Sequence, residues 1–165
     1  MSSSSTEQTG AARELRAEAT VDAAPDQVWR LLTDFGRMPE WSPELVMMVP
    51  LKPGGLRLGQ WYLGVNRRKA ALWPTRSVVA RLEPGRVVAW DTTSSGARWI
   101  WEVSESPDRP GTTRVVHRRP VPRDLTKVSR MFAPVFLGGN DSHADELEAG
   151  MQQTVDRLKA AVEGS

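Results

Sequence analysis

The sequence predicts an α+β domain in which one antiparallel sheet packs against a long C-terminal helix. Two observations carry this prediction. Short strand-like segments separated by turn residues follow one another from residue 15 to residue 119. Beyond them, apolar residues recur at helical spacing from Ser142 to Val162, over about 20 residues and about 30 Å. A helix of this kind buries its apolar side against one face of a sheet.

Seven strands and two short helices are expected. Apolar and polar residues alternate from Leu15 to Val21, which predicts the first strand. Pro25 suits the first turn of a short helix, and the segment from Phe35 to Pro43 predicts a tight helical turn followed by a loop. The other six strands are expected at Leu45–Leu51, Gln60–Arg67, Leu72–Leu82, Arg86–Thr93, Arg98–Glu105 and Thr112–Arg119.

Length and composition are those of one ordinary globular domain. The 165 residues predict a single domain over 13–165, preceded by a polar, flexible lead over 1–12. With 22 basic and 20 acidic residues the net charge is only +2, which argues against a nucleic-acid partner. The chain shows neither a membrane-spanning run nor a secretory signal, and it lacks cysteine, so we expect a cytoplasmic protein.

Several kinds of chemistry lack their sequence patterns. His117 and His143 are the two histidines, far apart in the sequence and without cysteine companions, so no metal site is expected. The chain has no Gly-x-Ser-x-Gly elbow, no Walker loop and no Gly-x-Gly-x-x-Gly motif. We therefore expect no nucleotide cofactor and no serine nucleophile.

Motifs spread over residues 14–163 occur in an order that matches a known superfamily. They are Ala24–Trp29, Asp34–Glu44, Gly59–Arg68, Trp73 with Leu82–Arg86, and Glu148–Met151 followed by Leu158–Lys159. The chain resembles the START-like superfamily (SRPBCC, helix-grip or Bet v 1-like), and within it the bacterial polyketide cyclase/dehydrase-like branch. The resemblance implies a curved seven-stranded sheet that grips the C-terminal helix around an apolar cavity. It also implies binding or carriage of a small hydrophobic molecule, either a lipid or a polyketide-like compound.

Strand parity predicts which side chains face that cavity. Trp99 and Trp101 share one face of their strand, and His117 shares a face with Thr113 and Val115 in the next strand. For the tryptophans, plain core packing is the alternative interpretation. The predicted ligand-binding residues are Trp41, Tyr62, Asn66, Trp73, Thr75, Trp90, Trp99, Trp101, His117 and Met151.

The strand Gln60–Arg67 has two possible orientations. Its residues Trp61, Leu63 and Val65 are the more apolar set, whereas the resemblance turns Tyr62, Gly64 and Asn66 inward. In that second orientation the three apolar side chains face outward. They then predict a contact surface, for a homodimer or for a peripheral membrane contact.

Two residues are candidates for acid/base catalysis in an alternative, enzymatic interpretation. His117 can exchange a proton near neutral pH, and the phenol of Tyr62 can hold a ligand carbonyl, as a polyketide cyclase or dehydratase requires. The structural alternatives are a histidine packed in the sheet and a tyrosine that fills space. Asn66, Arg67 and Arg68 either orient an acidic ligand group at the cavity mouth or are solvated charges at a strand end.

The segment Leu125–Leu137 has apolar residues at helical spacing, interrupted by Pro134. It predicts a lid over the cavity, a surface for lipid or for a second subunit, or a segment that packs on the sheet edge.

Overall fold

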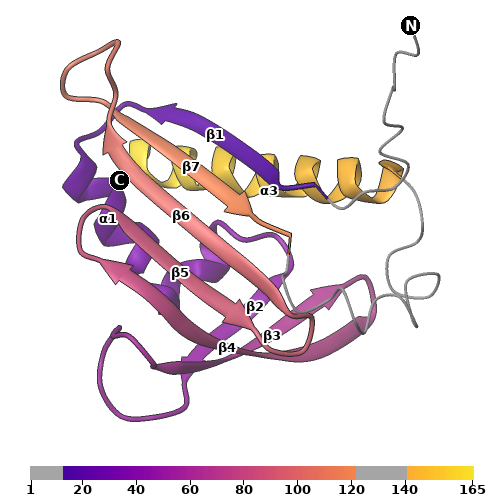
Figure 1. The fold of residues 1–165 in the computed structure, drawn as a ribbon. Coiled ribbons are helices and arrows are strands. Elements are labelled where there is room, and N and C mark those ends of the chain that lie inside the picture. The colour runs from indigo at the N-terminus through magenta and orange to yellow at the C-terminus, as the bar shows by residue number, and fades with distance from the viewer. Residues whose placement is uncertain (1–12, 122–140) are drawn as a thin grey trace, which may run out of the picture.

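The computed structural model describes residues 13–121 and 141–165, which form an antiparallel sheet and three helices (Figure 1). The strands are β1 (Leu15–Val21), β2 (Leu45–Pro50), β3 (Trp61–Arg68), β4 (Ala71–Glu83), β5 (Val87–Thr92), β6 (Ala97–Glu105) and β7 (Thr113–Arg119). The helices are α1 (Pro25–Thr33), the 3₁₀ helix η1 (Phe35–Glu40) and α3 (Asp141–Glu163). The seven strands lie in the order β1-β7-β6-β5-β4-β3-β2. The predicted α+β architecture is confirmed, and the element ends lie close to those expected.

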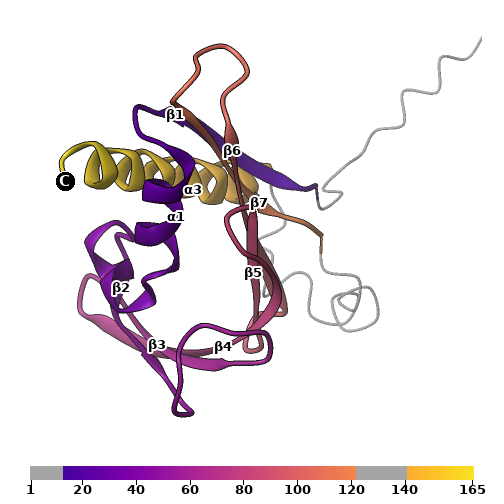
Figure 2. The same cartoon turned by 90° about the vertical axis from the view of Figure 1, so that its left-hand side faces the viewer.

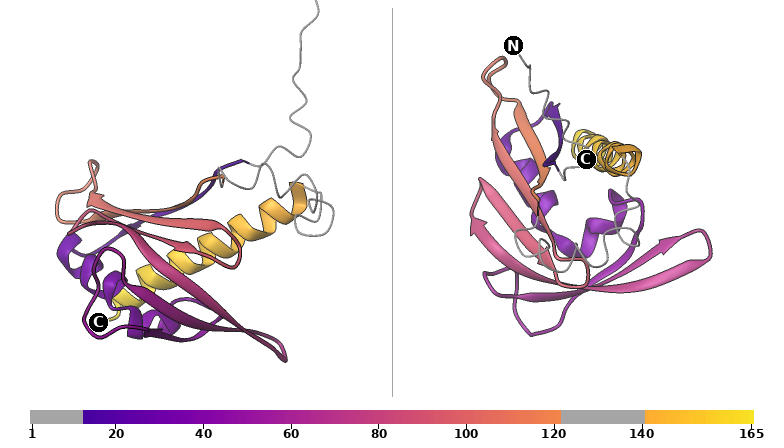
Figure 3. Two further views of the ribbon diagram at one scale, coloured as in Figure 1. Left: turned by 60° about the horizontal axis from the view of Figure 1, so that its bottom comes forward. Right: turned by 45° about the vertical axis from the view of Figure 1, so that its right-hand side comes forward.

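The sheet curves strongly, so that its two halves form two sides of one concave surface (Figure 2). One half contains β1, β7, β6 and β5, and the other contains β4, β3 and β2, with α3 lying across the concave side (Figures 2 and 3). Helix α3 packs mainly on β1, while η1 packs on β2. The helical spacing seen in the sequence explains the packing of α3, because Met151, Val155 and Leu158 form its buried face.

Turn chemistry determines how consecutive strands connect. Gly85 and Gly96 adopt positive φ angles of 76° and 69° in the turns that follow β4 and β5. A residue with a Cβ atom rarely adopts this conformation, so glycine allows both hairpins to close within a few residues.

The register of β3 settles the orientation that sequence pattern left open. Tyr62 pairs with Ser77, Gly64 with Thr75 and Asn66 with Trp73, and these residues face the concave side. The orientation implied by the resemblance is therefore correct.

The apolar set of β3 lies on the convex side of the sheet. Trp61, Leu63 and Val65 are half-buried there, and they align with Val49 and other apolar residues of β2 and β4. Their apolar character reflects a cross-strand ladder on the outer face rather than the core. The contact surface expected at these residues stays a prediction.

Two of the sequence expectations concern other parts of the chain. The lead over 1–12 and the segment Leu125–Leu137 both lie outside the described residues. Among the helices that the structure describes, none is long and apolar enough to span a membrane.

Candidate functional site

The concave face divides into two parts. The deep cluster consists of Trp41, Tyr62, Trp90, Trp101 and Met151, all of them buried members of one hydrophobic core. The open cluster consists of Asn66, Trp73, Thr75 and Trp99, which are half-buried. Within this set, Asn66, Trp73 and Thr75 lie together on the paired strands β3 and β4, whereas Trp99 lies on β6, with β5 between them, near the same end of the sheet. Nine of the ten predicted ligand-binding residues thus fall into these two clusters, and His117 lies beside the deep one.

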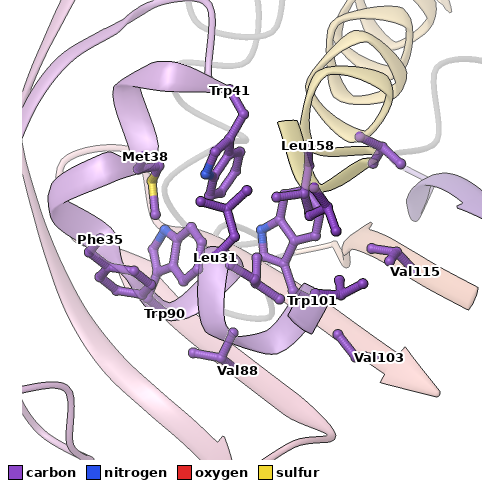
Figure 4. Close-up of a cluster of buried hydrophobic side chains, with 14 of the residues drawn as sticks. Leu31, Phe35, Met38, Trp41, Val88, Trp90, Trp101, Val103, Val115 and Leu158 are labelled. Atoms are coloured by element: carbon purple, nitrogen blue, oxygen red, sulfur yellow. The ribbon is translucent and has the colours of Figure 1, made fainter. Parts of the chain in front are cut away.

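The deep cluster is filled by the protein's own aromatic rings (Figure 4). Trp41 and Trp101 are 0% and 1% exposed and meet edge to face, with ring centroids 5.5 Å apart. Phe35 contacts both Tyr62 and Trp90 in the same manner, at 4.9 and 5.2 Å. Rings at these separations leave no space for a guest between them. The cavity implied by the resemblance therefore does not extend into this part of the concave face.

Two polar atoms in the deep cluster lack partners. The indole Nε1 atoms of Trp41 and Trp101 are buried and donate no hydrogen bond to any described residue. An unsatisfied buried donor costs free energy, so close packing of the rings outweighs this loss.

The open cluster combines aromatic surface with hydrogen-bonding groups. Asn66 Nδ2 donates to Thr75 Oγ1 at 3.1 Å, and this pair lies next to Trp73 in the register of β3 and β4. Gly64 occupies the inward position between Asn66 and Tyr62, where a Cβ atom would lie 2.8 Å from Thr75 Oγ1. The absence of a side chain at this position lets Thr75, Leu45 and Met48 pack closely around the glycine.

His117 is buried in the sheet and held from two directions. Its Nδ1 atom lies 3.1 Å from the carbonyl oxygen of Ile100, and because that oxygen only accepts, Nδ1 carries the proton. Its ring stacks on Trp101 with centroids 3.9 Å apart. Burial lowers the pKa of His117 to about 3, so the imidazole is neutral at physiological pH. These contacts match the packed-histidine interpretation.

The other sequence candidates are separated by the fold. Tyr62 is 6% exposed, and burial raises the pKa of its phenol, which keeps the hydroxyl protonated. Arg68 pairs with Glu44 at 3.1 Å in solvent, and Arg67 donates through Nε to the carbonyl oxygen of Lys69 at 3.0 Å. By alternation Arg67 lies on the opposite face of β3 from Asn66, whereas Arg68 shares the face of Asn66 but is exposed and paired with Glu44, so both arginines match the solvated-charge alternative.

Sequence reasoning missed one residue of the concave face, Arg119. It ends β7 two positions after His117, and its Cζ atom lies 5.0 Å from the centroid of the Trp99 ring. Its Nε atom is buried and has no hydrogen-bond partner among the described residues. Burial lowers the pKa of Arg119. The same strand parity that placed His117 inward would have identified it.

Two depressions on the described surface lie elsewhere. One, of about 490 Å³, is lined by β1 and by the turn between β6 and β7, and the other, of about 340 Å³, lies between α1 and the end of α3. Neither is lined by a predicted ligand-binding residue. Within the described ranges no group of three acidic or histidine side chains could hold a metal ion.

This combination of a curved sheet, a gripped helix and an aromatic concave face defines the helix-grip class of proteins. The family model described as polyketide cyclase/dehydrase and lipid transport matches residues 12–163. The chain belongs to this family. None of the curated proteins compared with the sequence matches it.

Solved structures show the same fold. The Polyketide_cyc-like protein Cgl2372 of Corynebacterium glutamicum is 22% identical, with 91% of each chain covered and a TM-score of 0.63. The ZhuI aromatase/cyclase of Streptomyces sp. R1128 is 19% identical, with 92% of this chain and 93% of that chain covered and a TM-score of 0.64. At these identities the likeness establishes the fold and leaves the substrate open.

Proposed function

We propose that the protein binds and carries a small, largely apolar molecule, and that this molecule lies on the open cluster. The observation that carries the proposal is the contrast between the two parts of the concave face. Trp99 remains half-buried beside a core whose other aromatic rings are closely packed, and Trp73 is half-buried near the start of β4. Apolar surface that a ligand covers there contributes about 25 cal/mol per Å² to affinity.

Polar groups in the open cluster support a ligand that carries oxygen functions. Asn66 and Thr75 bond to one another, and each retains further capacity to donate or accept a hydrogen bond. A few such groups on an aromatic wall orient a ligand without dominating its affinity. Lipids and polyketide-like compounds, the ligand classes associated with the family, have this character.

A cyclase or dehydratase activity is the alternative function, with His117 or Tyr62 as acid/base. One structural neighbour, the aromatase/cyclase of Streptomyces sp. R1128, supports it by analogy. The environment of His117 does not favour it, because an imidazole with a pKa of about 3 is a weak base and is not a proton donor at neutral pH. Carriage is therefore the function that the geometry supports better.

The proposal is tested with a fluorescent probe, 1-pyrenebutanol, which accepts excitation energy from tryptophan. Saturable energy transfer is expected for the wild type. Trp99→Ala removes one wall of the open cluster, so we expect affinity to fall by about tenfold, the order of effect of losing one aromatic contact. Trp61→Ala is the matched control, since Trp61 is also half-buried but lies on the convex face.

Two results would argue against this site. If the probe produces no saturable transfer with the wild type, the carrier function fails. If Trp61→Ala lowers the affinity for the probe as much as Trp99→Ala does, binding takes place on the convex side and the assignment to the open cluster is wrong.

A further inference from the structure

The two consecutive arginines at the end of β7 have opposite electrostatic surroundings. Arg118 lies on the convex face, where it pairs with Glu14 at 3.1 Å and with Glu102 at 2.9 Å. Arg119 lies on the concave face, and none of the ion pairs among the described residues includes it. One arginine is thus neutralised by the fold, and its neighbour faces the candidate ligand site with no described carboxylate to compensate its charge.

The described neighbours of Arg119 on the concave face supply no negative charge. Leu15 is its partner across the β1–β7 pair, Trp99 lies beneath its guanidinium, and His117 is the next inward residue of the same strand. The cation–π contact with Trp99 offsets only part of the free energy lost when a guanidinium leaves water. The lowered pKa of Arg119 has the same cause. An anion bound here would therefore pair with a guanidinium that the fold has already removed from water.

Arginine is suited to one class of anion in this position. Its planar fork binds the two oxygens of a carboxylate through parallel hydrogen bonds. Nε of Arg119, which forms one side of that fork, is the atom that the described residues leave without a partner. The aromatic surface of Trp99 lies directly beside it and can cover the adjoining apolar part of a ligand.

We propose that Arg119 anchors the carboxylate of the bound molecule, so that the ligand class is amphipathic carboxylic acids rather than neutral apolar compounds. This inference rests on the proposed function and narrows it. In the bound state the carboxylate pairs with Arg119, and the apolar body lies over the open cluster.

The test compares two probes with the same apolar body, 1-pyrenebutyrate and 1-pyrenebutanol, by energy transfer from tryptophan. We expect the wild type to bind the acid at least about tenfold more tightly than the alcohol, the scale of one charged hydrogen-bonded pair. Arg119→Gln should abolish this preference, so that the Kd values of the acid and the alcohol become equal. Arg119→Lys keeps the charge but loses the planar fork, so it should retain part of the preference for the acid. Arg118→Gln, the matched control on the convex face, should retain all of that preference.

The outcomes separate the two proposals. Equal affinity of the wild type for both probes, or an acid preference that survives in Arg119→Gln, overturns the carboxylate anchor while ligand binding stands. Binding of neither probe to the wild type overturns the proposed function and the anchor with it. Retained affinity for 1-pyrenebutanol also shows that each variant is folded, so a loss of acid binding alone cannot come from unfolding.

Discussion

At the scale of single residues, burial decides which chemistry a side chain can perform. His117 has the side chain most suited to proton transfer in this chain, yet its position beneath Trp101 removes it from water and lowers its pKa to about 3. The same burial makes His117 a determinant of acid stability. Arg119 shows the complementary case, in which partial burial leaves a permanent charge available to a ligand.

The pKa of His117 predicts how stability depends on pH. The folded pKa lies below the value of about 6.5 in the unfolded chain, so between pH 6.5 and about 3 only the unfolded state binds this proton. The free energy of unfolding should therefore fall as the pH is lowered through this window. We expect a loss of about 2 kcal/mol from this group between about pH 7.5 and 5.0, measured by urea denaturation.

The variant His117→Gln is the comparison for that measurement. It keeps an amide that can donate to the Ile100 carbonyl but cannot titrate, so its stability should depend much less on pH over the same interval. Carboxylates such as Glu148, whose pKa is lowered in the folded protein, contribute to the pH dependence of both proteins, so their effect cancels in the comparison. Equal pH dependence in the two proteins would show that His117 is not the buried neutral group described above.

Sequence patterns predicted the direction of these side chains but not their depth. Alternation in β6 and β7 correctly turned Trp101 and His117 inward. Whether an inward ring is covered by protein or by solvent depends on what η1 and α3 bring across the sheet, and local patterns carry no information on that. Arg119 follows His117 by two positions in β7 and so shares its face, which means that parity alone would have identified it.

At the scale of elements, the close approach of β2, β3 and β4 depends on a missing side chain. Gly64 faces Thr75 across the β3–β4 pair and lies against Leu45 and Met48 of β2. The alternation along β3 pointed to the wrong face as the core, because the outer ladder of this half of the sheet is also apolar. Only the register, which depends on tertiary pairing, distinguishes the two faces.

Gly64→Ala should destabilise the fold by about 1–3 kcal/mol, the usual cost of overpacking. The new Cβ atom would lie 2.8 Å from Thr75 Oγ1 and 3.4 Å from the sulfur of Met48. Thermal or urea unfolding measures this, and adding Thr75→Ala should recover part of the loss, because it removes the closest atom.

Gly150 provides the matched control for that substitution. It lies within α3, and a Cβ atom there would meet no described atom within 4 Å. Gly150→Ala should therefore stabilise the protein by about 0.5–1 kcal/mol through helix propensity. If Gly64→Ala were equally harmless, the tight contact at Thr75 would not exist in solution.

At the scale of the whole molecule, the curved sheet and α3 divide one concave surface between stability and binding. The deep cluster fixes α3, η1 and the sheet together (Figure 4). The open cluster adds half-buried indole and polar groups to the same concave face. The overall fold was predictable because helix period, strand order and turn residues are local features of the sequence. The boundary between core and candidate site was not, because it arises from contacts between elements far apart in the chain.

The central claim is that a ligand contacts the open cluster and not the deep one. The most direct measurement follows the indole N–H signals of the seven tryptophans in ¹H–¹⁵N spectra, each assigned with a Trp→Phe variant, during titration with 1-pyrenebutanol. We predict that the signals of Trp73 and Trp99 shift saturably, while those of Trp41 and Trp90 in the deep cluster and of Trp61 on the convex face stay in place. Shifts confined to Trp61, or no saturable shift at Trp73 or Trp99, would contradict it.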